Sequence, residues 1–257
     1  MRKKKIIYLV MFFLAIFFIL NINTTRSIGI NYKVMEYKIP IYLKVMDFYN
    51  RHYNYKYLVN NINNKIYDKK NIILNTTKWI KDNIKKTPEG VDTIDYHPLT
   101  IVQRRLGKGD QFNDLLSVLL VYANVDSFYY LSSNNISHSL TFFKIDNYWS
   151  IIDPYYGIYF VNNEGLFASV EDIKNSEWEV FTLESKKINL SNIKEVFGNK
   201  FNDYDEVKNF YDKLFYNLPS SNDIDNTYIF DRGGRSYTQD PLGRIRYEIH
   251  NMIKLKH

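Results

Sequence analysis

The sequence contains no cysteine among its 257 residues. A thiolate is the nucleophile of cysteine hydrolases and a common zinc ligand, so every cysteine-based mechanism and every thiolate metal site is excluded. Disulfide bonds are excluded for the same reason. An exported protein that uses no disulfides is compatible with this composition.

Concentrated basic charge is absent as well. The net charge is +6, and part of it comes from Arg2 and Lys3–Lys5 at the N-terminus. A nucleic-acid-binding protein usually gathers lysine and arginine on one face, and no such stripe is visible, so we expect no nucleic-acid partner. The sequence also shows no internal repeat and no separate second domain.

Clear patterns for metal or cofactor binding are missing too. Asp110, Asp114 and His138 could supply oxygen and nitrogen ligands, but carboxylates four residues apart on a helix are typical of a solvated edge. Gly107 and Gly109 are not part of the GxxxxGK[ST] pattern of a phosphate-binding loop. We therefore predict no metal and no cofactor.

What the sequence does contain is a basic and then apolar N-terminus. Residues 2–5 are Arg-Lys-Lys-Lys, and residues 6–20 are uninterrupted apolar sequence, the pattern of a secretory signal peptide or a signal-anchor. No charge occurs over residues 6–25, about 20 residues, which is enough to span a bilayer as one helix. The basic end should stay in the cytoplasm. We therefore predict a membrane-anchored or secreted protein whose bulk lies in the periplasm or at the cell surface.

Helical spacing of apolar residues predicts several helices, one of which leaves little polar face and should be buried. The predicted helices cover residues 42–62, 70–84, 112–122 (the buried one) and 203–216. A capping-box pattern at Ser169–Asp172 predicts a further short helix. Aromatic and β-prone segments predict strands, with a hairpin turn at Asp146-Asn147. The predicted strands cover residues 125–131, 140–145, 148–152 and 156–161.

The segment from Gly107 to Gly157 has the order of a cysteine hydrolase site without the sulfur. Such a site places a nucleophile at a helix N-terminus, an imidazole as base and a carboxylate that orients the imidazole. Gly109 begins the apolar helix, His138 opens one hairpin strand, and Asp153 closes the other. Folding at the hairpin turn brings the two strand ends together. The sequence therefore predicts a site with Gly109 at the nucleophile position.

This stretch resembles the transglutaminase-like superfamily, the bacterial relatives of the papain fold. Members show a G-x-C turn, a helix with leucine pairs, a strand histidine and a W-x-x-x-D-P sequence. The residues that carry the resemblance are Gly107-Lys108-Gly109, Asp110-Gln111, Leu115-Leu116, Leu119-Leu120, Asn124-Val125, His138 and Trp149-Ser150-Ile151-Ile152-Asp153-Pro154. The resemblance covers roughly residues 70–174.

The resemblance implies that His138 is the base and Asp153 its orienting partner. It also implies that the nucleophile position holds Gly109, which has no side chain to attack a substrate. A shift of one residue would put Lys108 at this position, and a shift of two residues would put Asp110 there. Both shifts disturb the alignment of the helix.

A cleft that has lost its reaction could still bind a ligand. Asp110, Gln111 and Trp149 are the candidate binding residues, although Trp149 also fits a position in the core. Ser117 and Ser139 are poor candidates for a substitute nucleophile. Ser117 lies two turns into a buried helix, and Ser139 should point away from the histidine across its strand.

We predict an α+β, papain/transglutaminase-like fold with N-terminal helices, a central helix packed on an antiparallel sheet, and one N-terminal membrane helix. The expected parts are a signal-anchor or signal peptide (1–27), a helical lead-in (28–69), a transglutaminase-like domain (70–200) and a C-terminal helix with a turn-rich tail (201–257). The expected function is that of a pseudoenzyme, which binds a peptide, a cell-envelope protein or a glycan in the old active-site cleft. Two alternatives remain. One is a hydrolase that uses His138 with Asp153 or Asp110, and the other is a purely structural, membrane-tethered partner protein.

Overall fold

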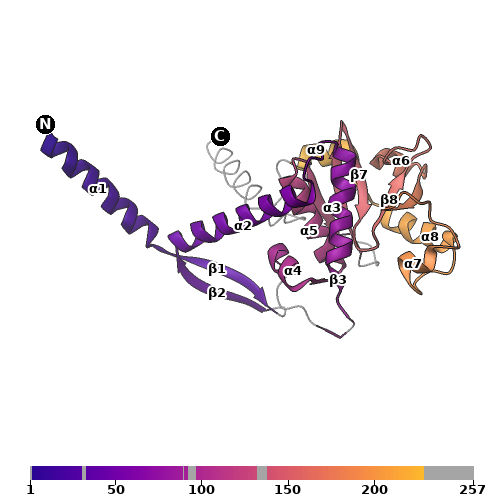
Figure 1. Ribbon diagram of the computed structural model, residues 1–257, viewed down its shortest axis with the longest axis horizontal. Coiled ribbons are helices and arrows are strands. Elements are labelled where there is room, and N and C mark those ends of the chain that lie inside the picture. Colours follow the sequence, from indigo (N-terminus) through magenta and orange to yellow (C-terminus); the bar gives the residue numbers. More distant parts are fainter. Residues whose placement is uncertain (1, 31–32, 89, 92–96, 132–137, 229–257) are drawn as a thin grey trace.

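A five-stranded antiparallel sheet forms the centre of the protein, and helices pack on both of its faces (Figure 1). The computed structural model describes residues 2–30, 33–88, 90–91, 97–131 and 138–228. The mixed helix-and-sheet fold that the sequence predicts is confirmed, with helices first, then a central helix, then the sheet.

The strands of the sheet lie side by side in the order in which they occur in the chain, and each neighbouring pair is antiparallel. They are β5 (Ser127–Leu131), β6 (Ser139–Ile145), β7 (Tyr148–Asp153), β8 (Ile158–Val161) and β9 (Glu179–Thr182). The hairpin of β6 and β7 turns at Asp146 and Asn147, as predicted. Asp146 has a φ of 50°, which aspartate tolerates in a tight turn, so the hairpin forms without glycine.

One face of the sheet is covered by the helices that come first in the chain. They are α2 (Ile41–Ile62), α3 (Lys69–Asn83), α4 (Pro98–Arg104) and α5 (Gly109–Tyr122). Helix α5 lies between the sheet and the other three helices, and all residues from Gln111 to Leu120 are buried. This central position explains why the sequence of α5 has so little polar face.

The opposite face is covered by the helices that come later in the chain. They are α6 (Val170–Lys174), α7 (Ile193–Phe197), α8 (Tyr204–Phe215) and α9 (Ser221–Tyr228). The predicted capping box is confirmed, since Ser169 Oγ accepts from Asp172 N and the Asp172 carboxylate accepts from Ser169 N. Helix α8 confirms the helix expected over 203–216. Helix α9 is not apparent from the sequence, because Ile224 is its one aliphatic residue.

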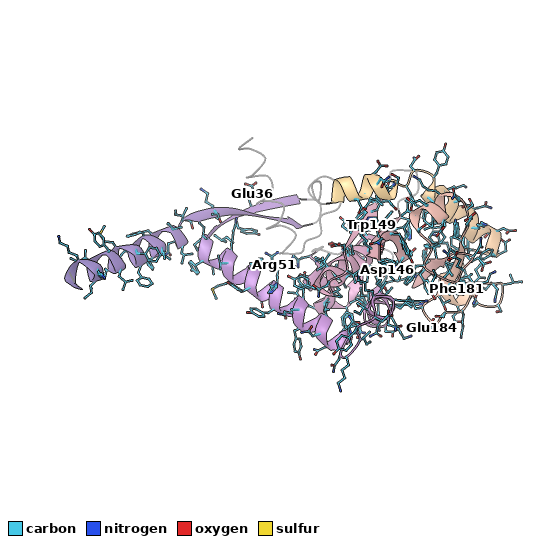
Figure 2. All side chains as sticks on the ribbon, turned by 90° about the horizontal axis from the view of Figure 1, so that it is seen from above. Glu36, Arg51, Asp146, Trp149, Phe181 and Glu184 are labelled. Carbon is cyan, nitrogen blue, oxygen red and sulfur yellow. The ribbon has the colours of Figure 1, made fainter. Side chains whose placement is uncertain are left out.

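The N-terminal part projects away from the sheet and its helices (Figure 1, Figure 2). It consists of α1 (Arg2–Leu20), β1 (Asn23–Ile30) and β2 (Lys33–Pro40), and the two strands form an antiparallel hairpin. Residues 28–30 and 33–40 are therefore strand, and within the helical lead-in expected for residues 28–69 the helix is α2, which covers the helix predicted over 42–62. β-Branched threonine, isoleucine and valine favour strand here, and Pro40 is the N-cap at which α2 begins.

The apolar N-terminal segment does not form the membrane-spanning helix that the sequence predicts. Helix α1 ends at Leu20, because the residues after it turn into β1 and pair with β2. Within the ranges that the structure describes, no helix is both long enough and apolar enough to cross a membrane. The uncharged stretch of residues 6–25 is thus divided between a helix and a strand.

A short parallel pairing fixes the start of α5. Strand β3 (Lys85–Lys86) follows α3 and pairs with β4 (Leu106–Gly107), which directly precedes α5. A Cβ added at Gly107 would lie 3.1 Å from the ring of Phe112, so close packing favours glycine at this position. The pairing also brings Lys86 to the N-terminal end of α5.

Candidate functional site

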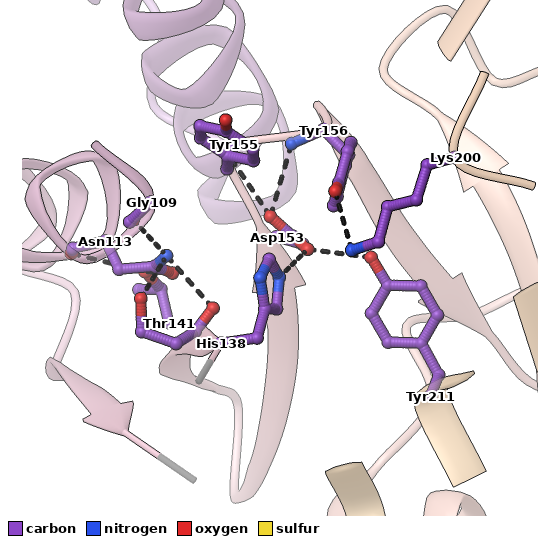
Figure 3. Close-up of polar contacts among 10 residues, drawn as sticks. Gly109, Asn113, His138, Thr141, Asp153, Tyr155, Tyr156, Lys200 and Tyr211 are labelled. Atoms are coloured by element: carbon purple, nitrogen blue, oxygen red, sulfur yellow. Dashed lines mark hydrogen bonds and ion pairs between the residues drawn. The ribbon is translucent and has the colours of Figure 1, made fainter. Parts of the chain in front are cut away.

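His138 and Asp153 form a hydrogen-bonded pair at one end of the β6–β7 hairpin (Figure 3). His138 directly precedes β6 and Asp153 is the last residue of β7, so the antiparallel register brings them together. His138 Nε2 lies 2.6 Å from Asp153 Oδ2. His138 is 8% exposed and Asp153 is 0% exposed. This is the arrangement in which a carboxylate orients an imidazole.

The Asp153 carboxylate accepts three hydrogen bonds besides that of His138. The Tyr211 hydroxyl donates to Oδ2 over 2.7 Å, and the backbone N–H groups of Tyr155 and Tyr156 donate to Oδ1 over 3.0 and 3.2 Å. Burial alone would raise the pKa of Asp153. The electrostatic interaction and hydrogen bond with His138, followed by the bonds from Tyr211 and Tyr156, lower this pKa overall. The buried carboxylate is therefore held in its ionised form.

Tyr211 is a site residue that the sequence analysis did not single out. It lies on α8, in a segment 58 residues after Asp153, and no local pattern connects the two. Burial and the neighbouring carboxylate raise the pKa of the Tyr211 phenol, so the hydroxyl stays protonated and donates. One signal was available, because Tyr211 shares the apolar face of α8 with Val207 and Leu214. A buried phenol on such a face needs a hydrogen-bond partner.

Gly109 is the first residue of α5, and nothing around it requires glycine. An added Cβ would meet no atom closer than the Tyr155 ring at 4.0 Å, which is ordinary contact, whereas Gly107 is tightly packed. The backbone of Gly109 also does not have a positive φ, so its conformation is open to other residues. The Tyr155 ring lies 6.3 Å from the His138 ring, between centroids. A Cβ would therefore fit at the helix N-terminus, beside a tyrosine ring that also contacts the His138 ring (Figure 3).

Asn113 connects the start of α5 to the strand that follows His138. Its Nδ2 donates to the carbonyl oxygens of Gly109 and Ser139 over 2.9 and 3.1 Å. Its Oδ1 accepts from Thr141 Oγ1 over 2.8 Å. Because Asn113 is fully buried, these bonds hold the helix N-terminus and the β6 strand in a fixed relation.

The two polar residues after Gly109 differ in their surroundings. Asp110 is exposed on the first turn of α5. Gln111 is 2% exposed, and its Oε1 accepts from Lys108 N over 3.0 Å and from Arg104 Nη2 over 2.7 Å. Gln111 thus satisfies a free N–H group at the helix start. Ligand binding by Asp110 and Gln111 stays a prediction.

Trp149 and the two serines lie in the interior. Trp149 is 1% exposed, and its Nε1 donates to Asp225 Oδ1 over 2.8 Å beside α9 (Figure 2). Ser139 is 1% exposed and Ser117 is 0% exposed, and both hydroxyls are hydrogen-bonded to groups on α5. Ser139 therefore faces α5, whereas His138 packs against Phe210 and Tyr211 of α8, so the two neighbours point apart as predicted. Ligand binding by Trp149 also stays a prediction.

The structure does not bring together Asp110, Asp114 and His138, the residues that could have supplied metal ligands. Across the described ranges, no three His, Asp or Glu side chains form a group that could hold a metal ion. Asp110, Asp114 and His138 are therefore not such a group.

Aromatic rings and lysines surround the His138–Asp153 pair (the dyad), and no local pattern in the sequence points to them. The Tyr156 ring stacks on the His138 ring with centroids 5.6 Å apart, and the Phe210 ring meets it edge-on at 5.5 Å. Lys86 Nζ lies 4.1 Å from the centre of the Tyr155 ring. Lys200 Nζ lies 3.9 Å from the centre of the Phe210 ring. These residues come from four separate segments, so no spacing in the sequence connects them.

The sequence matches no protein-family model and no curated protein in comparisons with known proteins. One similar solved structure is that of a "Putative Cysteine Protease" from Cytophaga hutchinsonii, with 18% identity and a TM-score of 0.36 over 54% of this chain and 51% of that chain. Another is that of a "Putative Protease" from Parabacteroides distasonis, with 12% identity and a TM-score of 0.34 over 64% of this chain and 40% of that chain. The chain thus spans 51% of one neighbour and 40% of the other, and the likeness is distant.

Proposed function

We propose that this protein is a transglutaminase-like domain without a nucleophile, which binds a peptide or another cell-envelope ligand beside His138 and Asp153. The observation that carries the proposal is the buried histidine–aspartate pair next to the N-terminus of a buried helix. The first residue of that helix, Gly109, has space around it but no side chain.

The orientation of the imidazole supports the resemblance to this superfamily. In a cysteine hydrolase, one ring nitrogen takes the thiol proton while the other is held by a carboxylate. Here His138 Nε2 is held by Asp153, so Nδ1 is the nitrogen left for the other role (Figure 3). The position of Gly109 at the helix N-terminus is where the sulfur of such an enzyme would be stabilised.

The described residues offer neither a nucleophile for covalent hydrolysis nor a good base at Asp153 for direct attack by water. Covalent catalysis needs a nucleophile within hydrogen-bond reach of the base, and Gly109 supplies none. The buried hydroxyls of Ser117 and Ser139 are directed to α5 and do not replace it. For the alternative hydrolase, Asp153 is a poor base for water, because it is fully buried and accepts four hydrogen bonds. Asp110 is exposed, and the Asp110→Asn variant in the assays below tests whether it acts as a base for water.

The proposed function is tested by activity assays and by binding measurements on a variant with a bulky side chain at position 109. The full-length chain, kept in mild detergent, is assayed with peptidase, amidase and transamidase substrates, and no turnover above buffer is expected. Binding of capped peptides and soluble peptidoglycan fragments is measured by calorimetry. Gly109→Trp should fill the space beside Tyr155 and weaken binding by about tenfold or more, which is the loss of one well-packed contact.

Glu164→Trp is the matched control, because Glu164 lies on an exposed turn between β8 and α6. It should leave the affinity unchanged. Turnover that disappears in His138→Ala would overturn the proposal of a non-catalytic domain. Turnover that disappears in Asp110→Asn as well would establish the alternative hydrolase.

The proposal also places the domain outside the cytoplasm. The apolar part of α1 covers residues 6–20 and follows four basic residues, which fits the core of a secretory signal. Its large side chains are exposed in the folded chain, for example Phe17 at 62% and Phe18 at 67%. Exposed apolar side chains on all sides of a helix are expected where the export machinery receives them.

An alkaline phosphatase reporter fused after His257 tests the location, because the reporter is active only outside the cytoplasm. We expect an active fusion, and deletion of residues 2–20 should abolish its activity while the amount of fusion protein stays similar. Full activity of the deleted form would contradict the export proposal.

A further inference from the structure

Two lysine amines lie on the aromatic rings beside the dyad. Lys86 Nζ is 4.1 Å from the centre of the Tyr155 ring and 4.5 Å from that of Tyr156. Lys200 Nζ is 3.9 Å from the centre of the Phe210 ring, and it donates a hydrogen bond to the Tyr156 hydroxyl over 2.8 Å. Both amines thus lie near Tyr156, whose ring stacks on the dyad histidine. Figure 3 shows Lys200, Tyr156 and His138 together.

The buried Asp153 carboxylate does not balance the positive charge around the turn that follows it, residues 154–157. Asp153 acts electrostatically on both Lys86 and Lys200, but its oxygens already accept from His138, Tyr211 and two backbone N–H groups. In the part of the chain that the structure describes, neither lysine is in a salt bridge with a carboxylate. A third lysine, Lys81, lies against Gly157 at the end of the same turn and adds to the positive charge.

Hydrogen-bond donors of the two amines remain available for a ligand. An ammonium group has three N–H donors, and a ring face attracts the charge without serving as a strong acceptor. Partial burial lowers the pKa of both Lys86 and Lys200, with the charge of Asp153 acting in the opposite direction. A bound anion would supply acceptors and a compensating charge, while both side chains are exposed enough to reach it.

We propose that Lys86 and Lys200 form a carboxylate-binding site beside the His138–Asp153 dyad, so that the ligand of the cleft is a peptide with a free carboxylate. This inference rests on the proposed function and adds the chemistry of the ligand. A carboxylate placed between the two amines would accept hydrogen bonds from both, and such charge-assisted bonds are stronger than neutral ones. Tyr156, with its hydroxyl held by Lys200, would form the floor of the site.

The carboxylate could belong to the end of a peptide or to an acidic side chain, and three capped tripeptides separate these sources. Ac-Ala-Ala-Ala-OH carries a terminal carboxylate, Ac-Ala-Glu-Ala-NH₂ carries a side-chain carboxylate, and Ac-Ala-Ala-Ala-NH₂ carries neither. Binding to the full-length chain is measured by NMR titration at low salt, because screening weakens such contacts. At least one charged peptide should bind about tenfold more tightly than the neutral one, the effect expected of charge-assisted hydrogen bonds.

The variant that tests the site is Lys86→Met/Lys200→Met, because methionine keeps an unbranched side chain over the rings and removes the charge. It should lose the preference for charged peptides and keep its affinity for the neutral one. Lys194→Met is the matched control, since Lys194 is exposed on α7, and it should keep the preference. Thermal melting of each variant shows whether the fold is retained.

The outcomes separate this inference from the proposed function. Equal binding of all three peptides, still sensitive to Gly109→Trp, would overturn the carboxylate site and leave the peptide cleft standing. If no peptide binds, titration with sodium acetate against sodium chloride at equal ionic strength tests the site alone. Saturable acetate shifts that are lost in the double variant would support the site without the cleft, and the absence of such shifts would overturn it.

Discussion

Gly109→Cys is expected to create a thiol whose pKa lies well below the ~8.5 of a free cysteine. The new sulfur would stand at the N-terminus of α5, where the helix dipole and free N–H groups stabilise a thiolate. The space next to Tyr155 accepts a Cβ, and the same ring contacts the His138 ring, with the centroids 6.3 Å apart. The substitution would therefore restore the arrangement that the resemblance implies.

The alkylation rate with iodoacetamide, followed from pH 4 to pH 10, measures this pKa. Since the chain has no cysteine, each variant carries one thiol and no background reaction. A pKa lowered by about two units would raise the rate at pH 6 by about tenfold, because the larger thiolate fraction outweighs the lower nucleophilicity of a weaker base. Asn163→Cys, on an exposed turn, is the reference thiol.

Two controls give this experiment its meaning. Adding His138→Ala to Gly109→Cys should remove part of the lowering and leave the part that comes from the helix. Gly109→Ala should be as stable as the parent or more so, because an alanine in a helix is favoured over glycine by up to about 1 kcal/mol. The same titration curve for Gly109→Cys and Asn163→Cys would mean that the site is no longer arranged around a nucleophile.

Asp153→Ala is expected to lower the free energy of unfolding by about 3–5 kcal/mol at pH 7, the range seen when one partner of a buried charged pair is removed. Four donors would lose their acceptor inside the protein, among them His138 Nε2 and the Tyr211 hydroxyl. Tyr211→Phe removes one of these donors and should cost about 1.5–3 kcal/mol, the usual value for a hydrogen bond to a charged group. Urea unfolding followed by circular dichroism measures both losses.

The effect of Asp153 should also depend on pH in a defined direction. Its folded-state pKa lies below the ordinary value of 3.8, so the unfolded chain takes up the proton first as the pH falls. The stability that the carboxylate contributes is therefore complete above about pH 5 and is lost as the pH falls through 3.8 toward the folded-state pKa. Asp153→Asn should flatten this part of the pH profile. Asp82→Asn, an exposed control on α3, should retain it, and an unchanged profile in Asp153→Asn would contradict the assignment.

The sequence predicts the sheet and its central helix because local signals and burial agree there. The β6–β7 hairpin has β-prone segments on both sides of Asp146, and α5 has an apolar run long enough for a buried helix. The pairing of His138 with Asp153 follows from the hairpin, since the two strand ends must meet. The hairpin of β1 and β2 is missed, because an uncharged run from residue 6 to residue 25 favours one continuous helix.

The other residues around the dyad could not be predicted from local patterns in the sequence. Tyr211 and Lys200 reach the dyad from the far end of the chain, and Lys86 reaches it through a two-residue strand. Their positions depend on how α8 and β3 pack against the sheet, and side-chain spacing carries no information about such packing. Gln111, in contrast, is a residue that the sequence does point to. The sequence predicts ligand binding there, and the structure shows its amide oxygen accepting a hydrogen bond at the start of the helix.

The four hydrogen bonds to Asp153 make the three positions that the resemblance assigns to a catalytic triad (109, 138 and 153) unequal under mutation. Loss of the carboxylate would weaken the whole domain, so a chain without it would be removed by unfolding and proteolysis whatever its activity. Glycine in place of a side chain at position 109 costs the fold at most about 1 kcal/mol, because this position is not tightly packed and a helix can begin with glycine here. An enzyme of this architecture that is released from selection for catalysis would therefore lose its nucleophile first and keep its histidine–aspartate pair as part of the folded core.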